Sequence, residues 1–496
     1  MLTRRVSPPL SAWHQLSSRS GTGLVLLLAI GTFVGCAGLS VPTRAPYTAA
    51  PRASSAAWRP PADVPVRARA LADITTPVPV DPSAIYGLAD LINFAHRANP
   101  ETRRAWEEAR AAAARVARVE TAYPTLFLMA AGGTSRVADR APPPVGTFTV
   151  EGPGVTPGLQ LNWILLDFGR RSSDVEGRGQ DLFRANFAFN RKLQEVAFAV
   201  SRNYFDLNAI RARVTAARAT LDSAIAVEEA VDARLQQGLA TLPDLLLARQ
   251  ERARAAFEVE DALGSVADAE AALADSLGLS PTALMRVADV SAVPLPTELP
   301  QSVEQVIDRA LSRRPDLASR LANLRAREAE ERRARAEFWP RLSLSGSVDQ
   351  AVQRYRVGPP TGTFTMNETE YGAFLRFEWK LFDGFERENA LREAAALRGA
   401  ADADLAALEL RTIREVWKAY ADVKTALRKH EYALALLAAS QEAYEATLES
   451  YRSAGLASLL DLLAAERDLA RARTTEIQSR ADLLTSPAAL TFAAGD

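Results

Sequence analysis

Four aspartates form two pairs whose members lie almost the same distance apart along the chain. Asp167 is followed by Asp383 after 216 residues, and Asp244 is followed by Asp461 after 217 residues. Each acid lies where a helix is expected to start, and a carboxylate there accepts hydrogen bonds from the unpaired N–H groups of the first turn. We therefore interpret Asp167 and Asp383 as strand-to-helix N-caps, with a structural rather than a catalytic role. Capping is also one interpretation of Asp244 and Asp461, and a second follows from their place in the chain.

The other residues that could carry chemistry do not form a site. The three histidines, His14, His96 and His430, are far apart, and no group of histidine, cysteine and acidic residues has metal-ligand spacing. The segment Gly177-Arg178-Gly179 lacks the third glycine and the preceding strand of a nucleotide-binding turn. We expect no enzyme activity, no metal and no cofactor. The formal net charge of -1 gives no indication of nucleic-acid binding.

Cys36 is the single cysteine, and its surroundings indicate export and lipidation. A basic segment precedes the apolar run Leu24–Ile30, which is typical of a secretory signal and too short for a membrane-spanning helix of about 20 residues. The sequence Phe33-Val34-Gly35-Cys36 is similar to a bacterial lipobox. We predict that residues 1–35 are a lipoprotein signal peptide and that Cys36 is acylated. A plain cleaved signal with an incidental cysteine is the alternative.

The elements that would position the repeated aspartates belong to one long internal repeat. Pro124 recurs as Pro340 and Trp163 as Trp379. A repeat of this length exceeds solenoid units, so it implies two copies of one structural half. The predicted boundaries are an extended, Pro- and Ala-rich tether at 36–85, a first repeat at 86–279, a linker at 280–301, a second repeat at 302–486 and a C-terminal tail at 487–496.

Each half is predicted to contain a helix, two strands, a very long helix and a return helix. The first helices run from Glu101 to Tyr123 and from Asp316 to Trp339. Residues 180–237 and 400–454 contain neither glycine nor proline, so each long helix could approach about 70 residues, or about 100 Å. Gly238 and Gly455 end the long helices at a turn. The return helices start near Asp244 and Leu459, and the second is expected to end near Ser486.

Apolar and polar residues alternate in the predicted strands. The apolar positions of the second strand in each half are Leu159, Leu161, Trp163 and Leu165, and Leu375, Phe377, Trp379 and Leu381. Such alternation over about 10 residues is typical of a membrane strand, although a half-buried strand of a soluble sheet looks similar. Four strands are too few for the smallest spanning barrel of about 8 strands. Because an open sheet cannot lie in lipid, spanning strands would require several chains to share one barrel.

The order of these elements resembles the TolC-type outer-membrane efflux family, in its lipoprotein branch of OprM- and NodT-like proteins. The resemblance rests on Trp163-Ile164-Leu165-Leu166-Asp167-Phe168-Gly169 with its repeat Trp379-Lys380-Leu381-Phe382-Asp383-Gly384, and on the stretches from Gly238 to Leu246 and from Gly455 to Leu463. It covers the chain from about residue 86 to 486. It implies a mainly α protein with a membrane β part, built from two structural repeats with long coiled-coil helices.

The resemblance also implies an assembly and a function. The family forms homotrimers in which three chains contribute four strands each to one 12-stranded barrel, and the helices form a tunnel. The chain would be lipid-anchored in the outer membrane with a long periplasmic portion. It would act as a passive exit duct for drugs or other small molecules. The implied partners are a periplasmic membrane-fusion adaptor and an inner-membrane pump, most often of the resistance-nodulation-division type.

The second interpretation of the tip aspartates comes from this resemblance. In the family, aspartates on the return helix narrow a periplasmic gate, and links between the helix tips hold it shut. Asp461 falls on the first such position and Asp244 on the tip acid of the first repeat, whereas the second aspartate position is Ala464. The family's locking tyrosine aligns with Arg452, beside Tyr451, and its locking arginine aligns with Ala457. Gly238 and Gly455 would lie at the gate.

A different class of protein remains as the alternative. A periplasmic coiled-coil lipoprotein with a structural or adaptor role would account for Cys36 and for the long helices. It would not explain the four amphipathic strands in two matched hairpins.

Overall fold

The computed structural model describes residues 80–121, 124–140, 147–283, 285–290, 293–297, 302–357, 362–453 and 457–496. All of them belong to one compact unit of the chain, Thr75–Asp496. The predicted signal peptide, the acylation of Cys36 and most of the predicted tether lie outside the described residues, as does Gly455. Among the described helices, none has an apolar stretch long enough to cross a membrane.

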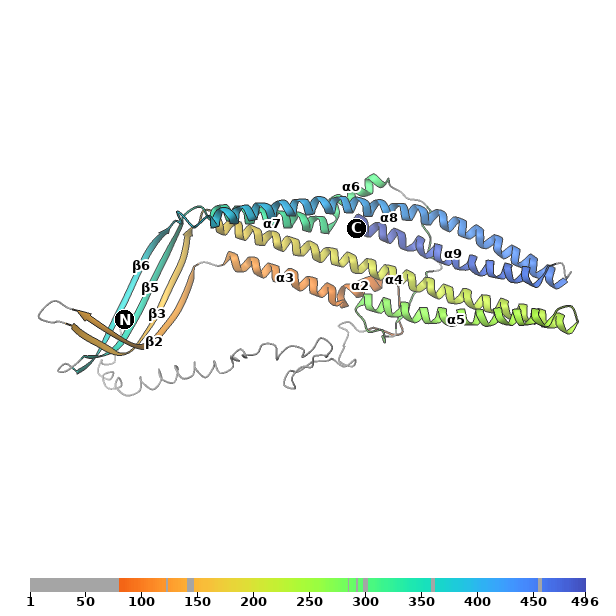
Figure 1. Cartoon of the computed structure of the whole chain (residues 1–496), viewed down its shortest axis with the longest axis horizontal. Coiled ribbons are helices and arrows are strands. Elements are labelled where there is room, and N and C mark those ends of the chain that lie inside the picture. Colours follow the sequence, from red (N-terminus) through yellow and green to blue (C-terminus); the bar gives the residue numbers. More distant parts are fainter. Residues whose placement is uncertain are drawn as a thin grey trace, which may run out of the picture. The chain divides into compact units, whose positions relative to one another are not determined.

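The two halves repeat the predicted order of elements (Figure 1). The first half contains β1 (Ile85–Tyr86), α2 (Leu88–Ala98), α3 (Pro100–Glu120), β2 (Thr125–Arg140), β3 (Thr147–Leu166), α4 (Arg170–Gln236) and α5 (Leu242–Leu277). The second contains β4 (Arg286–Val287), α6 (Val303–Arg313), α7 (Pro315–Ala336), β5 (Arg341–Val357), β6 (Gly362–Glu378), α8 (Glu386–Ser453) and α9 (Leu459–Ala494). Helices α3 and α7 correspond to the predicted first helices of the two halves, and each ends three residues before the predicted Tyr123 or Trp339.

Two short helices and a strand pair were not predicted. Helices α2 and α6 each have 11 residues, and a single residue, Asn99 or Arg314, separates each from the proline that starts the next helix. The linker at 280–301 contains β4, which pairs in parallel with β1. The linker is therefore attached to the start of the first repeat, because Ile85 pairs with Arg286 and Tyr86 with Val287.

The four long strands form one antiparallel sheet in the order β2-β3-β5-β6. They have 16 to 20 residues, longer than the predicted 10 or so. Strands β3 and β5 join the two halves, with Leu161 opposite Gly346. Strands β2 and β6 each pair with one strand only within the described chain, so both edges of the sheet remain available.

The register places the predicted apolar residues on one face. Directly opposed residues in an antiparallel sheet lie on the same face. One row across all four strands is therefore Leu128, Leu159, Val348 and Tyr371, and a second row contains Trp163, Leu344 and Leu375. Polar partners, such as Asn162 opposite Ser345, share the other face. The alternation in the sequence thus predicted the apolar face of the sheet.

The predicted end of the last strand was wrong. The alternation included Trp379 and Leu381 in the last strand, but β6 ends at Glu378, which is opposite Arg341. The residue before Arg341 is Pro340, which has no N–H to donate to a further ladder bond. Trp379 instead donates its indole N–H to the carbonyl oxygen of Phe338 at 3.1 Å.

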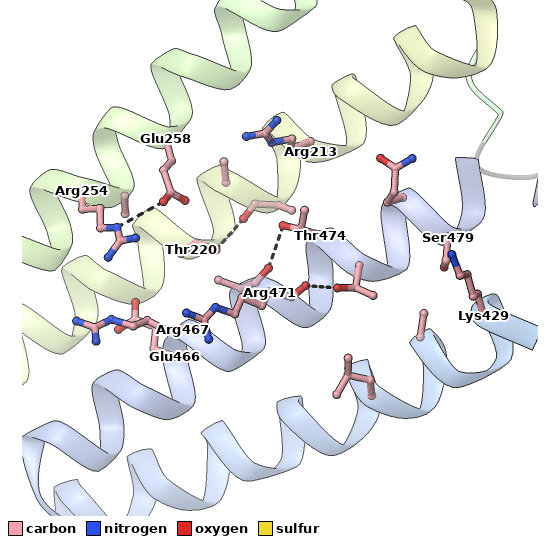
Figure 2. A pocket seen from close by; sticks show the side chains of 18 of the residues that line it. Arg213, Thr220, Arg254, Glu258, Lys429, Glu466, Arg467, Arg471, Thr474 and Ser479 are labelled. Carbon is pink, nitrogen blue, oxygen red and sulfur yellow. Dashed lines mark hydrogen bonds and ion pairs between the residues drawn. The ribbon is translucent and has the colours of Figure 1, made fainter. Parts of the chain in front are cut away.

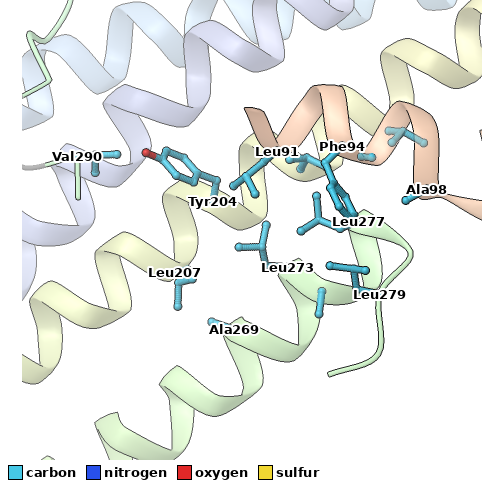
Figure 3. Packing of buried hydrophobic residues seen from close by; sticks show 14 residues of the cluster. Leu91, Phe94, Ala98, Tyr204, Leu207, Ala269, Leu273, Leu277, Leu279 and Val290 are labelled. Atoms are coloured by element: carbon cyan, nitrogen blue, oxygen red, sulfur yellow. The ribbon is translucent and has the colours of Figure 1, made fainter. Parts of the chain in front are cut away.

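Helices α4 and α8 have 67 and 68 residues, as the absence of glycine and proline over most of their length predicted. Each pairs with the return helix that follows it, so α4 and α5 form one hairpin and α8 and α9 form another (Figure 1). The two hairpins contact each other chiefly through α4 and α9. An apolar cluster beside the short helix α2 fixes α5 against α4 and includes Leu91, Tyr204, Leu273 and Leu277 (Figure 3).

The predicted C-terminal tail at 487–496 is part of helix α9, which continues to Ala494. A proline inside a helix removes one backbone hydrogen bond and usually ends or kinks it, which is why Ser486 was predicted as the end. Packing holds the helix together beyond Pro487. Phe492 stacks on Phe198 with ring centroids 4.9 Å apart, and Arg191 donates to the Phe492 carbonyl oxygen at 3.2 Å.

Candidate functional site

The strand-to-helix junction of the first half uses Asp167 as a hydrogen-bond acceptor. Its carboxylate accepts from the backbone N–H groups of Gly169 at 3.3 Å and Arg171 at 2.9 Å. The N-cap residue itself is Gly169, with φ of 96°, so Asp167 lies two residues ahead of the position that the sequence suggested. The physical role is the predicted one, since the carboxylate occupies N–H groups that the helix leaves unpaired.

The junction of the second half is reinforced by an arginine. Asp383 forms an ion pair with Arg387, and both side chains are nearly buried. Arg387 also donates to the carbonyl oxygen of Glu337, just after α7, at 3.5 Å. The repeat-related Arg171 donates in the same way to the carbonyl oxygen of Glu120, the last residue of α3. Sequence reasoning missed both arginines, although each lies four residues after a repeated aspartate.

At the other end of the long helices, both tip aspartates are part of capping boxes. The backbone N–H of Thr241 donates to the Asp244 carboxylate at 2.9 Å, and that of Ser458 donates to Asp461 at 3.0 Å. The hydroxyl and backbone N–H of Thr241 lower the pKa of Asp244, and those of Ser458 lower the pKa of Asp461. Both carboxylates are charged at neutral pH, as ordinary aspartates are, and the caps extend the charged range to lower pH.

The turn between α4 and α5 is closed at Gly238. Its φ of 74° is in the left-handed region that favours glycine, and no heavy atom lies within 4 Å of the place where a Cβ would stand. Leu239 donates from its backbone N–H to the Arg234 carbonyl oxygen at 2.8 Å. The glycine is required by the backbone of the turn and not by a close neighbour.

The two hairpin tips are connected through Arg234 and Tyr451. The Arg234 guanidinium lies 4.5 Å from the centroid of the Tyr451 ring and donates to the Tyr451 carbonyl oxygen. Tyr451 is only 4% exposed, whereas the neighbouring Arg452 is exposed to solvent. Tyr451 and Arg452 were the two candidates for the family's locking position, and the structure brings Tyr451 into contact with the other hairpin. Arg234 was not predicted.

Apolar packing surrounds this contact. One core cluster combines residues of all four hairpin helices, among them Val227, Leu245, Tyr444 and Leu462. Asp461 lies beside this cluster on the exposed side of α9, while Asp244 is half-buried. Among the described tip residues, Tyr451 belongs to this four-helix core, whereas Asp244 and Asp461 contact their own caps and not each other.

A cavity of about 930 Å³ lies between the two hairpins, next to the tip core (Figure 2). Its lining comes from α4, α5, α8 and α9 and includes both acidic and basic side chains. Arg467 on α9 forms an ion pair with Glu251 on α5. The neighbouring Glu466 is 6% exposed, and burial together with the charge of Glu251 raises its pKa to about 7.

The chain matches the family model described as "Outer membrane efflux protein" over residues 91–279 and 306–496. It is similar to protein CyaE of Bordetella pertussis, with 30% identity over 85% of this chain and 86% of that protein. It is also similar to outer membrane protein OprJ of Pseudomonas aeruginosa, with 29% identity over 62% and 63% of the two chains.

The fold matches that of a crystallised membrane protein from Pseudomonas aeruginosa, with a TM-score of 0.73 and 24% identity. The likeness covers 87% of this chain and 99% of the other. The solved structure therefore supports the protomer fold, and the two matched segments of the family model coincide with the two structural repeats.

Proposed function

Because this chain belongs to the outer membrane efflux protein family and is an outer-membrane channel, we propose that its gate lies where Arg234 and Tyr451 join the two hairpin tips. The single observation that carries the proposal is this contact, which links α4 of the first repeat to α8 of the second. A channel with helical hairpins can open at one end only if such links between hairpins are released. The alternative of a periplasmic structural or adaptor lipoprotein is not retained, since the family match includes both repeats.

The proposed assembly is a homotrimer with a shared 12-stranded barrel. Its support is the sheet itself, which has an apolar face and two edges, on β2 and β6, without a partner in the described chain. Edge N–H and C=O groups in lipid require partners, and a neighbouring copy of the same sheet would supply them. Lipid anchoring at Cys36 would add a second attachment to the outer membrane.

The proposed partners are a periplasmic membrane-fusion adaptor and an inner-membrane pump, which together with this channel would form a tripartite efflux system. Membership of the efflux family supports this proposal. A pump of the resistance-nodulation-division type is the partner that we propose specifically. The duct itself would be passive, and the pump would supply the energy.

Within the gate, we assign Asp461 a role in attracting cations. Its carboxylate is exposed and charged at neutral pH, as an ordinary aspartate is, and the hydrogen bonds from Ser458 lower its pKa further. Asp244 has the same cap in the first repeat but is less exposed. Three chains would bring three copies of each acid to the entrance, where a ring of negative charge raises the local concentration of cations. Exposed Arg452 would lie at the same tip.

Planar-bilayer recordings on the purified full-length chain test the role of Asp461. Asp461→Asn removes the charge but keeps an acceptor for the cap, and it should lower the preference for potassium over chloride. The matched control, Ser458→Ala, removes the capping hydroxyl while keeping the charge, and should leave ion selectivity unchanged. Equal selectivity in all three proteins would show that Asp461 acts only as a helix cap.

A further inference from the structure

The acidic residue Glu466 is buried at the boundary between the hairpins. It lies on α9, lines the cavity and is next to Arg467 (Figure 2). Arg467 forms an ion pair with Glu251 on α5, across the cavity. The side chains of Glu466 and Glu251 are largely buried, with Glu251 12% exposed, whereas the Arg467 side chain that pairs with Glu251 is 47% exposed. Burial and the charge of Glu251 both disfavour the charged form of Glu466, and the nearby cations Arg467 and Arg473 offset this only in part.

Other charged groups line the cavity, and some of them are paired with each other. From α4, Arg213 pairs with Asp261 at 3.5 Å, and from α5, Arg254 pairs with Glu258 at 3.6 Å. The remaining titratable or charged groups that line the cavity or act on Glu466 are Lys429, Tyr432 and Tyr444 on α8 and Arg471, Arg473 and Asp482 on α9. Figure 2 shows Lys429 at the opposite end of the cavity from Glu466.

We infer that Glu251, Glu466 and Arg467 form a protonation-controlled coupling site that sets how firmly the two hairpins hold together. With Glu466 neutral, Arg467 is free to bridge α9 to Glu251 on α5. With Glu466 charged, the new carboxylate repels Glu251 and competes for Arg467. The ion pair across the cavity is then weakened, and the hairpins are held by the tip core and by Arg234. This inference rests on the proposed gate.

The direction of the pH effect follows from linkage. Burial and the charge of Glu251 raise the pKa of Glu466 to about 7 in the packed hairpins. In separated hairpins the side chain would be hydrated, with an ordinary pKa of about 4.3. The packed form binds the proton more tightly, so its advantage is complete at low pH and is lost as pH rises through about 7. Between pH 6 and pH 8, the ratio of packed to separated hairpins should fall about tenfold.

Amide hydrogen exchange on the full-length protein in detergent tests this inference. After correction for intrinsic exchange rates, segments 242–262 and 459–478 should be about tenfold less protected at pH 8 than at pH 6. Glu466→Gln should abolish this difference and give the higher protection at both pH values. The control, Glu258→Gln, removes another carboxylate that lines the cavity and should retain the wild-type pH dependence.

A second variant covers the case in which Glu466→Gln does not fold. Glu251→Gln removes the like charge and leaves Arg467 to Glu466, so the midpoint of the exchange transition should move to lower pH. Exchange that does not change with pH in the wild type, or a Glu466→Gln protein with the wild-type dependence, would overturn the inference.

Conductance of the same samples separates this inference from the proposed gate. A conducting channel whose hairpins exchange independently of pH would refute the coupling site and leave the gate standing. A protein with Glu466-dependent exchange but no conductance would refute the gate and leave the coupling site standing.

Discussion

The guanidinium of Arg234 lies over the ring of Tyr451, although the two residues occupy equivalent positions in the two repeats. Each precedes its tip glycine, Gly238 or Gly455, by four residues. The duplication has therefore placed two different side chains at one position, and the difference makes an attractive contact possible. Two arginines there would repel each other, and two tyrosines would lack the cation.

We predict that Arg234→Ala opens the channel. A cation–π contact of this kind contributes about 0.5–2 kcal/mol, so its loss should raise the ratio of open to closed channels about 2- to 30-fold. Single-channel recordings would measure this as a higher open probability. Arg252→Ala is the matched control, since Arg252 pairs with Glu228 within its own hairpin at 3.2 Å. An open probability that rises equally in both variants would show that general loosening of the tip, and not the contact, controls opening.

The strand-to-helix junction yields a prediction on stability. Arg387→Ala would leave the Asp383 carboxylate without its ion pair and would remove the hydrogen bond to the Glu337 carbonyl oxygen, so it should destabilise the protein more than the loss of an exposed pair. The melting temperature of the purified protein should fall clearly. Arg392→Ala, on the same helix, removes an exposed arginine that lies 3.8 Å from Glu388 and should change stability by less than about 1 kcal/mol. Equal melting temperatures for both variants would contradict the importance of the junction.

A third prediction concerns Gly278, which ends α5 with φ of 74°. A Cβ at this residue would lie 2.7 Å from the Cα atom of Asn99, a contact that requires the backbone to move. Gly278→Ala should therefore destabilise the protein by about 2 kcal/mol or more, from the left-handed backbone and the clash together. Gly495 has the same relationship to Arg314 in the second repeat, with a contact of 2.9 Å to its Cα atom.

Gly264→Ala is the matched control for this prediction. Gly264 lies inside α5, and a Cβ there would meet nothing within 4 Å. Because alanine favours the helix over glycine by about 1 kcal/mol, the melting temperature should rise slightly. A fall for Gly264→Ala comparable to that for Gly278→Ala would mean that α5 does not tolerate any substitution of this kind, and the specific contact with Asn99 would lose its support.

The sequence predicted the repeated elements because their signals are local. Alternation placed Leu159 and Trp163 on one face of β3, and long stretches without glycine or proline marked α4 and α8. The errors arose where packing outweighs local preference. Helix α9 passes through Pro487 because Phe492 and its neighbours are held by α4.

The candidate site was only partly accessible from the sequence. Capping by Asp244 and Asp461 was suggested by their position just after a glycine-containing turn, whereas their partners in the capping boxes, Thr241 and Ser458, were not identified from the sequence. The contact between Arg234 and Tyr451 joins residues 217 positions apart, and no local sequence pattern predicts it. The repeat itself was the available signal, because it identifies the two residues as equivalent.

The last prediction concerns the proposed adaptor, which should bind at the hairpin tips. Leu239 is 63% exposed beside Gly238, and Leu460 is 67% exposed at the start of α9, so both can carry a photo-crosslinking amino acid without disturbing a core. Irradiation of cells should yield crosslinks from these two positions to a membrane-fusion adaptor. Tyr371 on β6, which is 83% exposed, is the control position and should give none. A further probe placed in the segment 143–149 completes the test. Crosslinks to the adaptor from that segment alone, with none from Leu239 or Leu460, would contradict docking at the tips.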